Sequence, residues 1–172
     1  ILKKNNENWR ISLIDTGQKT MTGGRLLRLK EFLKNEKSFL FTYGDGLSDV
    51  NIEKLIKFHK KHKKISTITA VVPPGRYGAL DIKKNNKVIN FMEKPKGDGN
   101  YINGGYFILN QKVFNYLKND ETIWEKGPLE KLAKDSQLSA YKHHGFWQSM
   151  DNLREKRYLN QLWETPEFCC HL

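Results

Sequence analysis

The sequence predicts an α/β fold in which helices pack against one mixed sheet. Residues 38–43 form a short apolar run typical of a buried strand, and residues 66–72 are rich in the β-branched side chains that favour strands. Residues 51–63, which lie between them, carry apolar side chains at helical spacing. Strand, helix and strand in this order form a parallel βαβ unit, which indicates the fold class.

The length and composition predict one globular domain. A chain of 172 residues has the length of an ordinary domain, so we expect residues 1–172 to share a single core. Hydrophobic residues make up 38% of the chain and aromatic residues 12%, which sets it apart from disordered proteins. No apolar run approaches the roughly 20 residues of a membrane span, so no membrane partner is expected.

The cysteines indicate the compartment. Cys169 and Cys170 are adjacent and have no cysteine elsewhere to pair with, so neither a disulfide framework nor a CxxC metal site is expected. A reducing, cytoplasmic setting follows from this.

The chain is strongly positive, and its densest lysine run fits the polar face of a predicted helix. The net charge is +11, and the densest lysine run, KFHKKHKK (57–64), falls on the polar side of the helix predicted at 51–63. We therefore expect a solvated helix face and no nucleic-acid partner. The long-range field of this charge still favours anionic substrates.

The first elements precede that unit. Residues 11–14 form a strand-like apolar run, and the segment TMTGGR (20–25) leads into leucines at helical spacing. Thr22 is suited to cap this helix, so the glycines and the arginine of the segment are expected near a helix N-terminus.

The later elements alternate under the same sheet. The segment PPGRYGALDI (73–82) is a turn that leads into a short strand, and Pro95 closes the strand KVINFMEKP. The remaining expected elements are a strand with an internal glycine pair at 101–109, short helices at 111–119 and 128–135, a strand within 138–147 and a last helix at 152–164.

Asp45 stands between two glycines directly after the strand at 38–43. Ligands of open α/β sheets gather outside the carboxyl ends of the strands, and a carboxylate there can hold Mg²⁺ that bridges to phosphate oxygens. The alternative is an Asp-Gly turn, in which the aspartate bonds its own backbone. The tripeptide GDG alone favours the turn.

Asp151 follows the aromatic segment HGFWQSM and precedes the last helix. Alone, either Asp151 or Asn152 is expected to cap that helix. If the fold places Asp151 beside Asp45, two carboxylates on one divalent cation form the usual protein share of a magnesium site. The pair is informative, whereas either aspartate alone is not.

Two further segments have structural and functional interpretations of similar weight. In MEKPKGDG (92–99), Glu93 and Lys94 are either exposed charges at a strand end or groups that bind a sugar hydroxyl and a phosphate. The segment INGG (102–105) is either a β-bulge or a surface on which a sugar ring packs against backbone.

Four other side chains are assigned to packing or to the surface. His143 and His144 lack an accompanying serine or cysteine nucleophile motif or an HExxH pattern. Tyr106 and Trp147 are expected in the core or on a strand face.

Five segments in order resemble the sugar nucleotidyltransferase family, and within it the enzymes that join CTP to glucose 1-phosphate. They are TMTGGRLLRLKEFL, FLFTYGDGLSDV, PPGRYGALDI, FMEKPKGDGNYINGGYF and HHGFWQSMDNLREKRYLNQLW. The resemblance runs from about residue 8 to residue 164. It implies a three-layer, Rossmann-like α/β fold with a mostly parallel mixed sheet, Mg²⁺ as cofactor, CDP-glucose and pyrophosphate as products, and a cytoplasmic homo-oligomer that supplies surface-polysaccharide synthesis.

The resemblance also implies roles for individual residues. Asp45 and Asp151 would hold Mg²⁺, and Lys94 would be catalytic as well as substrate-binding. The implied substrate-binding residues are Thr20, Arg25, Gly44, Gly78, Glu93, Lys94, Asn103 and Gly104. Because the attacking phosphate oxygen is already ionised, the reaction needs positioning and charge stabilisation and no general base.

The chain departs from the family at both ends. Members begin with a strand and a loop of the form GGxGTR, followed by a PKPM-like segment, and neither occurs here. We expect the C-terminal two-thirds of a nucleotidyltransferase domain, without its N-terminal strands and inactive by itself. The alternatives are a non-catalytic nucleotide- or sugar-phosphate-binding homologue and a thymidylyl- or uridylyltransferase. The C-terminal TPEFCCHL is assigned nothing.

Overall fold

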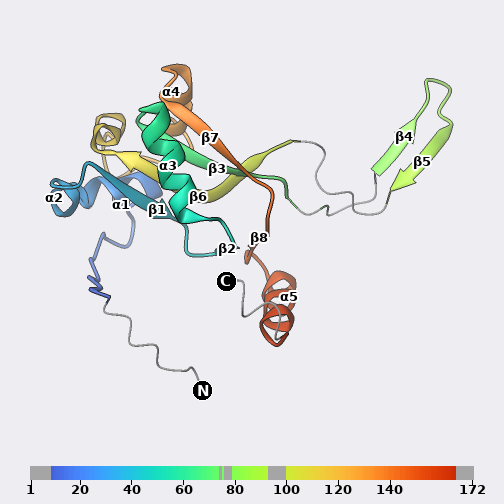
Figure 1. The fold of residues 1–172 in the computed structure, drawn as a ribbon, viewed down its shortest axis with the longest axis horizontal. Coiled ribbons are helices and arrows are strands. Elements are labelled where there is room, and N and C mark those ends of the chain that lie inside the picture. Colours follow the sequence, from blue (N-terminus) through green and yellow to red (C-terminus); the bar gives the residue numbers. More distant parts are fainter. Residues whose placement is uncertain (1–8, 74, 76–78, 93–99, 166–172) are drawn as a thin grey trace.

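The centre of the molecule is a four-stranded mixed sheet (Figure 1). The structure is a computed structural model that describes residues 9–73, 75, 79–92 and 100–165. The strands follow the spatial order β1 (Ser38–Thr42), β6 (Ile102–Asn110), β3 (Ser66–Val71) and β7 (Leu138–His143). β6 is antiparallel to β1 and β3, whereas β3 and β7 are parallel. Three strands therefore share one direction, although two of the three strand pairings in this sheet are antiparallel. The predicted mixed α/β sheet is confirmed.

The predicted strand–helix–strand unit is present, but its two strands are not neighbours. Helix α3 (Ile52–His62) connects β1 to β3, and β6 lies between these strands and pairs with both. The side chain of Asn51 caps the helix by accepting a hydrogen bond from the N–H of Lys54 at 2.8 Å. Lys63, with φ 58°, ends it in the left-handed conformation.

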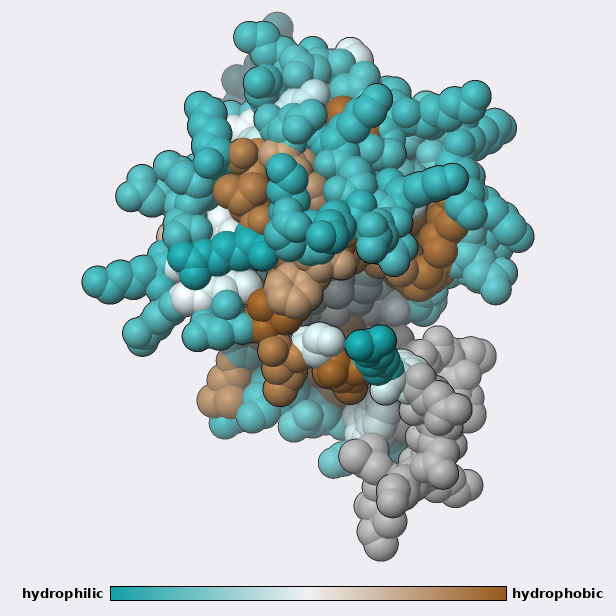
Figure 2. All heavy atoms as spheres, turned by 90° about the vertical axis from the view of Figure 1, so that its left-hand side faces the viewer, coloured by the Kyte–Doolittle hydropathy of each residue, from teal (hydrophilic) through white to brown (hydrophobic). Residues whose placement is uncertain are grey.

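The lysine run on α3 faces solvent, as predicted. Lys57, Lys60 and Lys61 are exposed, whereas Leu55 and His59 are buried against the sheet side. Figure 2 shows a face of the molecule on which hydrophilic residues predominate and hydrophobic side chains are interspersed. No helix in the described parts of the chain has the length and hydrophobicity needed to cross a membrane.

The other helices agree with the predicted positions, with two differences. They are α1 (Thr22–Arg28), α2 (Lys30–Leu33), the 3-10 helix η1 (Gln111–Tyr116), α4 (Pro128–Lys134) and α5 (Leu153–Trp163). The segment expected as an ordinary short helix at 111–119 is thus a 3-10 helix. The predicted cap by Thr22 is wrong, because Met21 is the N-cap of α1 and makes no capping hydrogen bond through its side chain within the described residues. The Thr22 hydroxyl instead accepts a hydrogen bond from the N–H of Trp124 at 2.9 Å.

Aromatic side chains form the centre of the core. Phe107 on β6 and Trp124 are fully buried, and their rings lie 5.7 Å apart in edge contact. Phe41 on β1 packs against both rings, at 5.5 and 5.8 Å. Leu26 of α1 and Leu132 of α4 belong to the same cluster. This core fixes β1 and β6, whose ends carry the site described below.

The expectation of a single sheet is wrong. Two further two-stranded sheets pair β2 (Gly46–Ser48) with β8 (Trp147–Ser149) and β4 (Ala79–Ile82) with β5 (Val88–Met92). β4 and β5 form a hairpin whose turn is closed by a hydrogen bond from the N–H of Lys83 to the carbonyl of Lys87, so their backbone groups are satisfied locally. The strand-like run at 11–14 is not a strand, and Leu13 there is 95% exposed.

Candidate active site

The candidate site is formed where β1 ends and the small β2–β8 sheet begins. Gly46 pairs with Ser149 in this sheet, and the N–H of Met150 donates to the carbonyl of Asp45 at 2.8 Å. These backbone contacts bring Asp45 and Asp151 together although more than a hundred residues separate them in the chain. β2 and β8 lie below the central sheet and beside α5 in Figure 1.

Both aspartates line one pocket of about 250 Å³. Its walls come from the end of β1, the start of β6 and the β2–β8 sheet. They consist of Thr42, Tyr43, Asp45, Gly46, Ile102, Asn103, Gly104, Gly105, Trp147, Ser149 and Asp151. The pocket therefore lies at the carboxyl end of β1, where ligands of open α/β sheets bind.

The two carboxylates are exposed and have no competing structural role among the described residues. Neither carboxylate forms a hydrogen bond or an ion pair with any of those residues. Asn152 caps α5 by accepting a hydrogen bond from the N–H of Glu155 at 3.0 Å, so Asp151 is not the cap. The backbone N–H of Asp151 donates to the Glu155 carboxylate at 2.7 Å.

This arrangement fits a hard divalent cation. Mg²⁺ prefers oxygen ligands and is commonly held by one or two carboxylates, with water and phosphate oxygens completing its coordination. Within the described part of the chain, no group of three or more histidine, cysteine or acidic side chains could hold a metal ion. A cation held by Asp45 and Asp151 would therefore take its remaining ligands from solvent or substrate.

The floor of the pocket is the glycine pair of β6. Trp147 donates from Nε1 to the carbonyl of Gly104 at 2.8 Å, and the N–H of Gly105 donates to Oδ1 of Asn103 at 2.9 Å. A Cβ at Gly104 would lie 2.9 Å from Cγ1 of Val71. A side chain at Gly104 therefore would not fit this packing.

The same segment is a β-bulge. Along the β3–β6 ladder, Ile68 pairs with Phe107 and Ala70 pairs with Asn103, so β6 has additional residues between the two pairs. The bulge interpretation of INGG is thus confirmed. It also places the bulged backbone against the pocket, so a role in binding a sugar is compatible with it.

Tyr43 connects the pocket to Glu125. Its hydroxyl donates to Oε1 of Glu125 at 2.6 Å and accepts from Nδ2 of Asn103 at 3.2 Å. Burial raises the pKa of the Tyr43 phenol, and the hydrogen bond to Glu125 raises the pKa further. The phenol is therefore protonated at neutral pH and acts as a donor.

Sequence reasoning gave Tyr43 and Glu125 no role and assigned Trp147 to the core or a strand face. Tyr43 could have been found from its position directly before the GDG tripeptide, and Trp147 from its position in the segment that precedes Asp151. Glu125 carries no local signal, because its partner Tyr43 lies 82 residues away.

Thr20 and Arg25 lie outside this pocket. Thr20 is buried, and the Arg25 guanidinium donates to Oγ1 of Thr16 at 2.7 Å and to the carbonyl of Gln18 at 3.3 Å. Gly44 lies between two residues that line the pocket, and a Cβ there would meet nothing within 4 Å. The predicted site residues Gly78, Glu93 and Lys94 lie outside the described residues.

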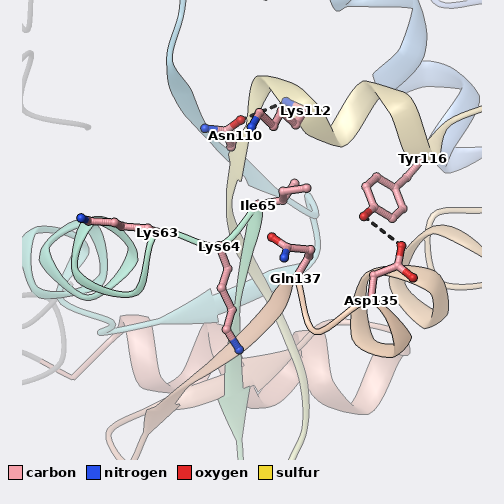
Figure 3. Close-up of a pocket in the computed structure, with 8 residues that line it drawn as sticks. All are labelled: Lys63, Lys64, Ile65, Asn110, Lys112, Tyr116, Asp135 and Gln137. Atoms are coloured by element: carbon pink, nitrogen blue, oxygen red, sulfur yellow. Dashed lines mark hydrogen bonds between the residues drawn. The ribbon is translucent and has the colours of Figure 1, made fainter.

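A larger cavity of about 420 Å³ lies at the opposite end of the sheet (Figure 3). It is bordered by Ile65 and Gln137, which precede β3 and β7. Among the described residues that line it, the carboxylate is that of Asp135, which accepts a hydrogen bond from the Tyr116 hydroxyl at 3.0 Å. Figure 3 shows the Lys63 side chain extending away from these groups. This cavity does not offer the pair of unpartnered acids found in the first pocket.

Comparison with known proteins assigns the family. Residues 3–151 match the family model described as nucleotidyl transferase. The chain belongs to the nucleotidyl transferase family. It is 54% identical over 158 residues to glucose-1-phosphate cytidylyltransferases from Salmonella typhimurium and Salmonella typhi, and these matches cover 92% of the chain. The chain spans 61% of the length of these two relatives.

A solved structure shares this fold. The crystal structure of HddC from Yersinia pseudotuberculosis matches with a TM-score of 0.68 and 21% sequence identity. The match covers 94% of this chain and 70% of the HddC chain. The predicted fold class is therefore confirmed at the level of the whole chain as well as of the sheet.

Proposed function

We propose that the protein is a glucose-1-phosphate cytidylyltransferase, which joins CTP and α-D-glucose 1-phosphate to give CDP-glucose and pyrophosphate. The observation that carries the proposal is the placement of Asp45 and Asp151, without structural partners in the described residues, on one pocket at the carboxyl end of β1. The substrates are those in the name of the Salmonella relatives. Membership of the nucleotidyl transferase family supports nucleotidyl transfer as the reaction at this pocket.

In this proposal Asp45 and Asp151 hold Mg²⁺, which would offset the charge of the phosphates and of the departing pyrophosphate. Asn103 and the backbone of Gly104 border the sugar phosphate, because they line the same pocket as the two acids. An ionised phosphate oxygen of the sugar phosphate attacks the α-phosphorus of CTP in line with the leaving group. The residues therefore position the substrates and stabilise the developing charge, and none of them has to take a proton.

The remaining family-implied residues complete the proposal. Lys94 supplies a point charge to a phosphate, and Glu93 accepts a hydrogen bond from a sugar hydroxyl. Gly78 and Gly44 border the substrates.

Thr20 and Arg25 contact the nucleotide. Because Arg25 lies away from the pocket, we propose that it reaches the nucleotide of a neighbouring subunit in a homo-oligomer. A cytoplasmic setting and a supply of CDP-glucose to surface-polysaccharide synthesis belong to the same proposal and rest on the resemblance.

A pyrophosphate-release assay on the full-length protein tests this function. The protein is offered ATP, CTP, GTP or UTP, and dTTP in parallel, with several sugar 1-phosphates, with and without Mg²⁺. We expect the fastest release with CTP and glucose 1-phosphate, and its loss when EDTA removes the metal. Faster release with dTTP or UTP would identify a different nucleotidyltransferase, and binding without release would identify a non-catalytic homologue.

A further inference from the structure

A chain of hydrogen bonds runs from the start of α1 to the floor of the pocket. The hydroxyl of Thr22 donates to Oε2 of Glu125 at 3.1 Å, and Oε1 of the same carboxylate accepts from Tyr43 at 2.6 Å. Tyr43 then accepts from Asn103 at 3.2 Å, and Asn103 accepts from the N–H of Gly105 at 2.9 Å. Four segments far apart in the sequence thereby meet behind one wall of the pocket.

The direction of these bonds fixes the orientation of the Asn103 amide. A phenol has a single proton, and because the Tyr43 hydroxyl gives it to Glu125, only its acceptor capacity remains for Asn103. The amide must therefore direct Nδ2 to Tyr43 and Oδ1 to Gly105. A carboxylate acceptor also strengthens the bond from Tyr43, since hydrogen bonds to charged groups are stronger than neutral ones.

The amide fixed in this way has one donor to spare. Nδ2 of Asn103 carries two protons, and Tyr43 is its single hydrogen-bond acceptor within the described residues. Asn103 is half-buried and lines the pocket together with Asp45 and Asp151. A ligand oxygen in the pocket is the natural acceptor for the remaining N–H.

We infer that Tyr43 and Glu125 act as a positioning pair that orients Asn103 toward an oxygen of the sugar 1-phosphate. This inference rests on the proposed function, which supplies the ligand. Neither residue touches the reacting atoms in this role. Tyr43 has a second contact with the same floor, because a Cβ at Gly105 would lie 2.9 Å from Cδ2 of its ring.

Steady-state kinetics of the full-length protein test the pair. Tyr43→Phe keeps the ring and removes the hydroxyl, so it should raise KM for glucose 1-phosphate about tenfold, the size expected for one lost hydrogen bond to a ligand. KM for CTP and kcat should change less than about twofold, because Asp45 and Asp151 are untouched. Glu125→Ala should reproduce this effect, whereas Glu125→Gln keeps an acceptor for Tyr43 and should restore a KM close to wild type.

Tyr116→Phe is the matched control. It also removes a tyrosine hydroxyl bonded to a carboxylate, that of Asp135, but at the cavity on the opposite end of the sheet. Its KM for glucose 1-phosphate should equal that of the wild type. An equal rise in KM for Tyr43→Phe and Tyr116→Phe, or an equal rise for both substrates in Tyr43→Phe, would overturn the inference.

Hydrogen exchange gives a readout that does not need turnover. Because Asn103 accepts the N–H of Gly105, loss of its anchor should speed exchange of the Gly105 amide severalfold in Tyr43→Phe and leave it unchanged in Tyr116→Phe. If the wild-type protein had no nucleotidyltransferase activity, the proposed function would be wrong. Hydrogen exchange at Gly105 would still test whether Tyr43 positions Asn103. Unchanged exchange at Gly105 in Tyr43→Phe would refute that role.

Discussion

Met150 donates its backbone N–H to the carbonyl of Asp45 at 2.8 Å and thereby extends the β2–β8 ladder to the edge of the pocket. The spacing of Asp45 and Asp151 consequently depends on backbone pairing and not on the carboxylates themselves. The carboxylates remain available for a ligand, because no described residue bonds them. Substitutions at either aspartate should thus separate chemistry from folding.

Asp45→Asn and Asp151→Asn should each abolish CDP-glucose formation, with a loss of at least about a hundredfold, because an amide is a poor ligand for Mg²⁺. The free energy of unfolding should change by less than about 0.5 kcal/mol, since both side chains are exposed and unpartnered among the described residues. Product formation and urea unfolding of the full-length variants measure the two effects. Asp135→Asn, at the opposite cavity, should keep full activity. Near-normal turnover in Asp45→Asn or Asp151→Asn would remove that residue from the metal site.

Local patterns predicted most elements well. The apolar run of β1, the β-branched residues of β3 and the helical spacing of α3 each report how one segment buries its own side chains, and the structure has these elements within one or two residues. The sequence left open whether Asp151 or Asn152 caps the last helix, and the structure shows that Asn152 is the cap.

Strand partners could not be predicted in the same way. Hydrophobic periodicity shows which face of a strand is buried, but β6 lies between β1 and β3 because of contacts across more than 30 residues. The hairpin of β4 and β5 was likewise expected in the main sheet. The meeting of Asp45 with Asp151 depends on the β2–β8 ladder, which spans about a hundred residues, so only the family resemblance suggested it.

Gly105→Ala should destabilise the fold by about 2 kcal/mol, more than the same change at Gly127. Both glycines have positive φ, +80° and +73°, a conformation that strains alanine at each. At Gly105 the new Cβ also lies 2.9 Å from the Tyr43 ring, whereas at Gly127 it meets nothing within 4 Å. Urea unfolding compares the two variants. Equal losses of unfolding free energy in the two variants would show that the Tyr43 ring can move aside without destabilising the fold.

Gly24→Ala should destabilise the fold by about 1–3 kcal/mol, because α1 packs directly on the backbone near Asp120. A Cβ at Gly24 would lie 2.6 Å from Cα of Asp120, and backbone there cannot move aside as a flexible side chain would. Asp120→Asn, which weakens the ion pair with Arg28, should cost less than this, since both side chains are roughly half exposed and solvent screens their attraction. Urea unfolding of both variants measures the difference. A larger loss for Asp120→Asn than for Gly24→Ala would mean that the ion pair, and not the close approach, holds α1 in place.

The stability of the protein should rise as the pH increases from 5 to 7, through His59 and His62. Nδ1 of His59 and Nε2 of His62 lie 2.8 and 2.7 Å from the hydroxyl of Thr67, which can donate to one ring only and must accept from the other. Burial lowers the pKa of both histidines from 6.5, with His62 lowering that of His59 further and Lys64 that of His62. The unfolded chain therefore binds more protons below pH 6.5, and the free energy of unfolding falls as the pH drops through that range. Urea unfolding at pH 5 and 7 measures this difference. The difference in unfolding free energy should shrink when both His59 and His62 are replaced by glutamine. It should persist in the control His144→Gln, which changes an exposed histidine. If the double variant kept the wild-type pH dependence, other groups would be responsible for it.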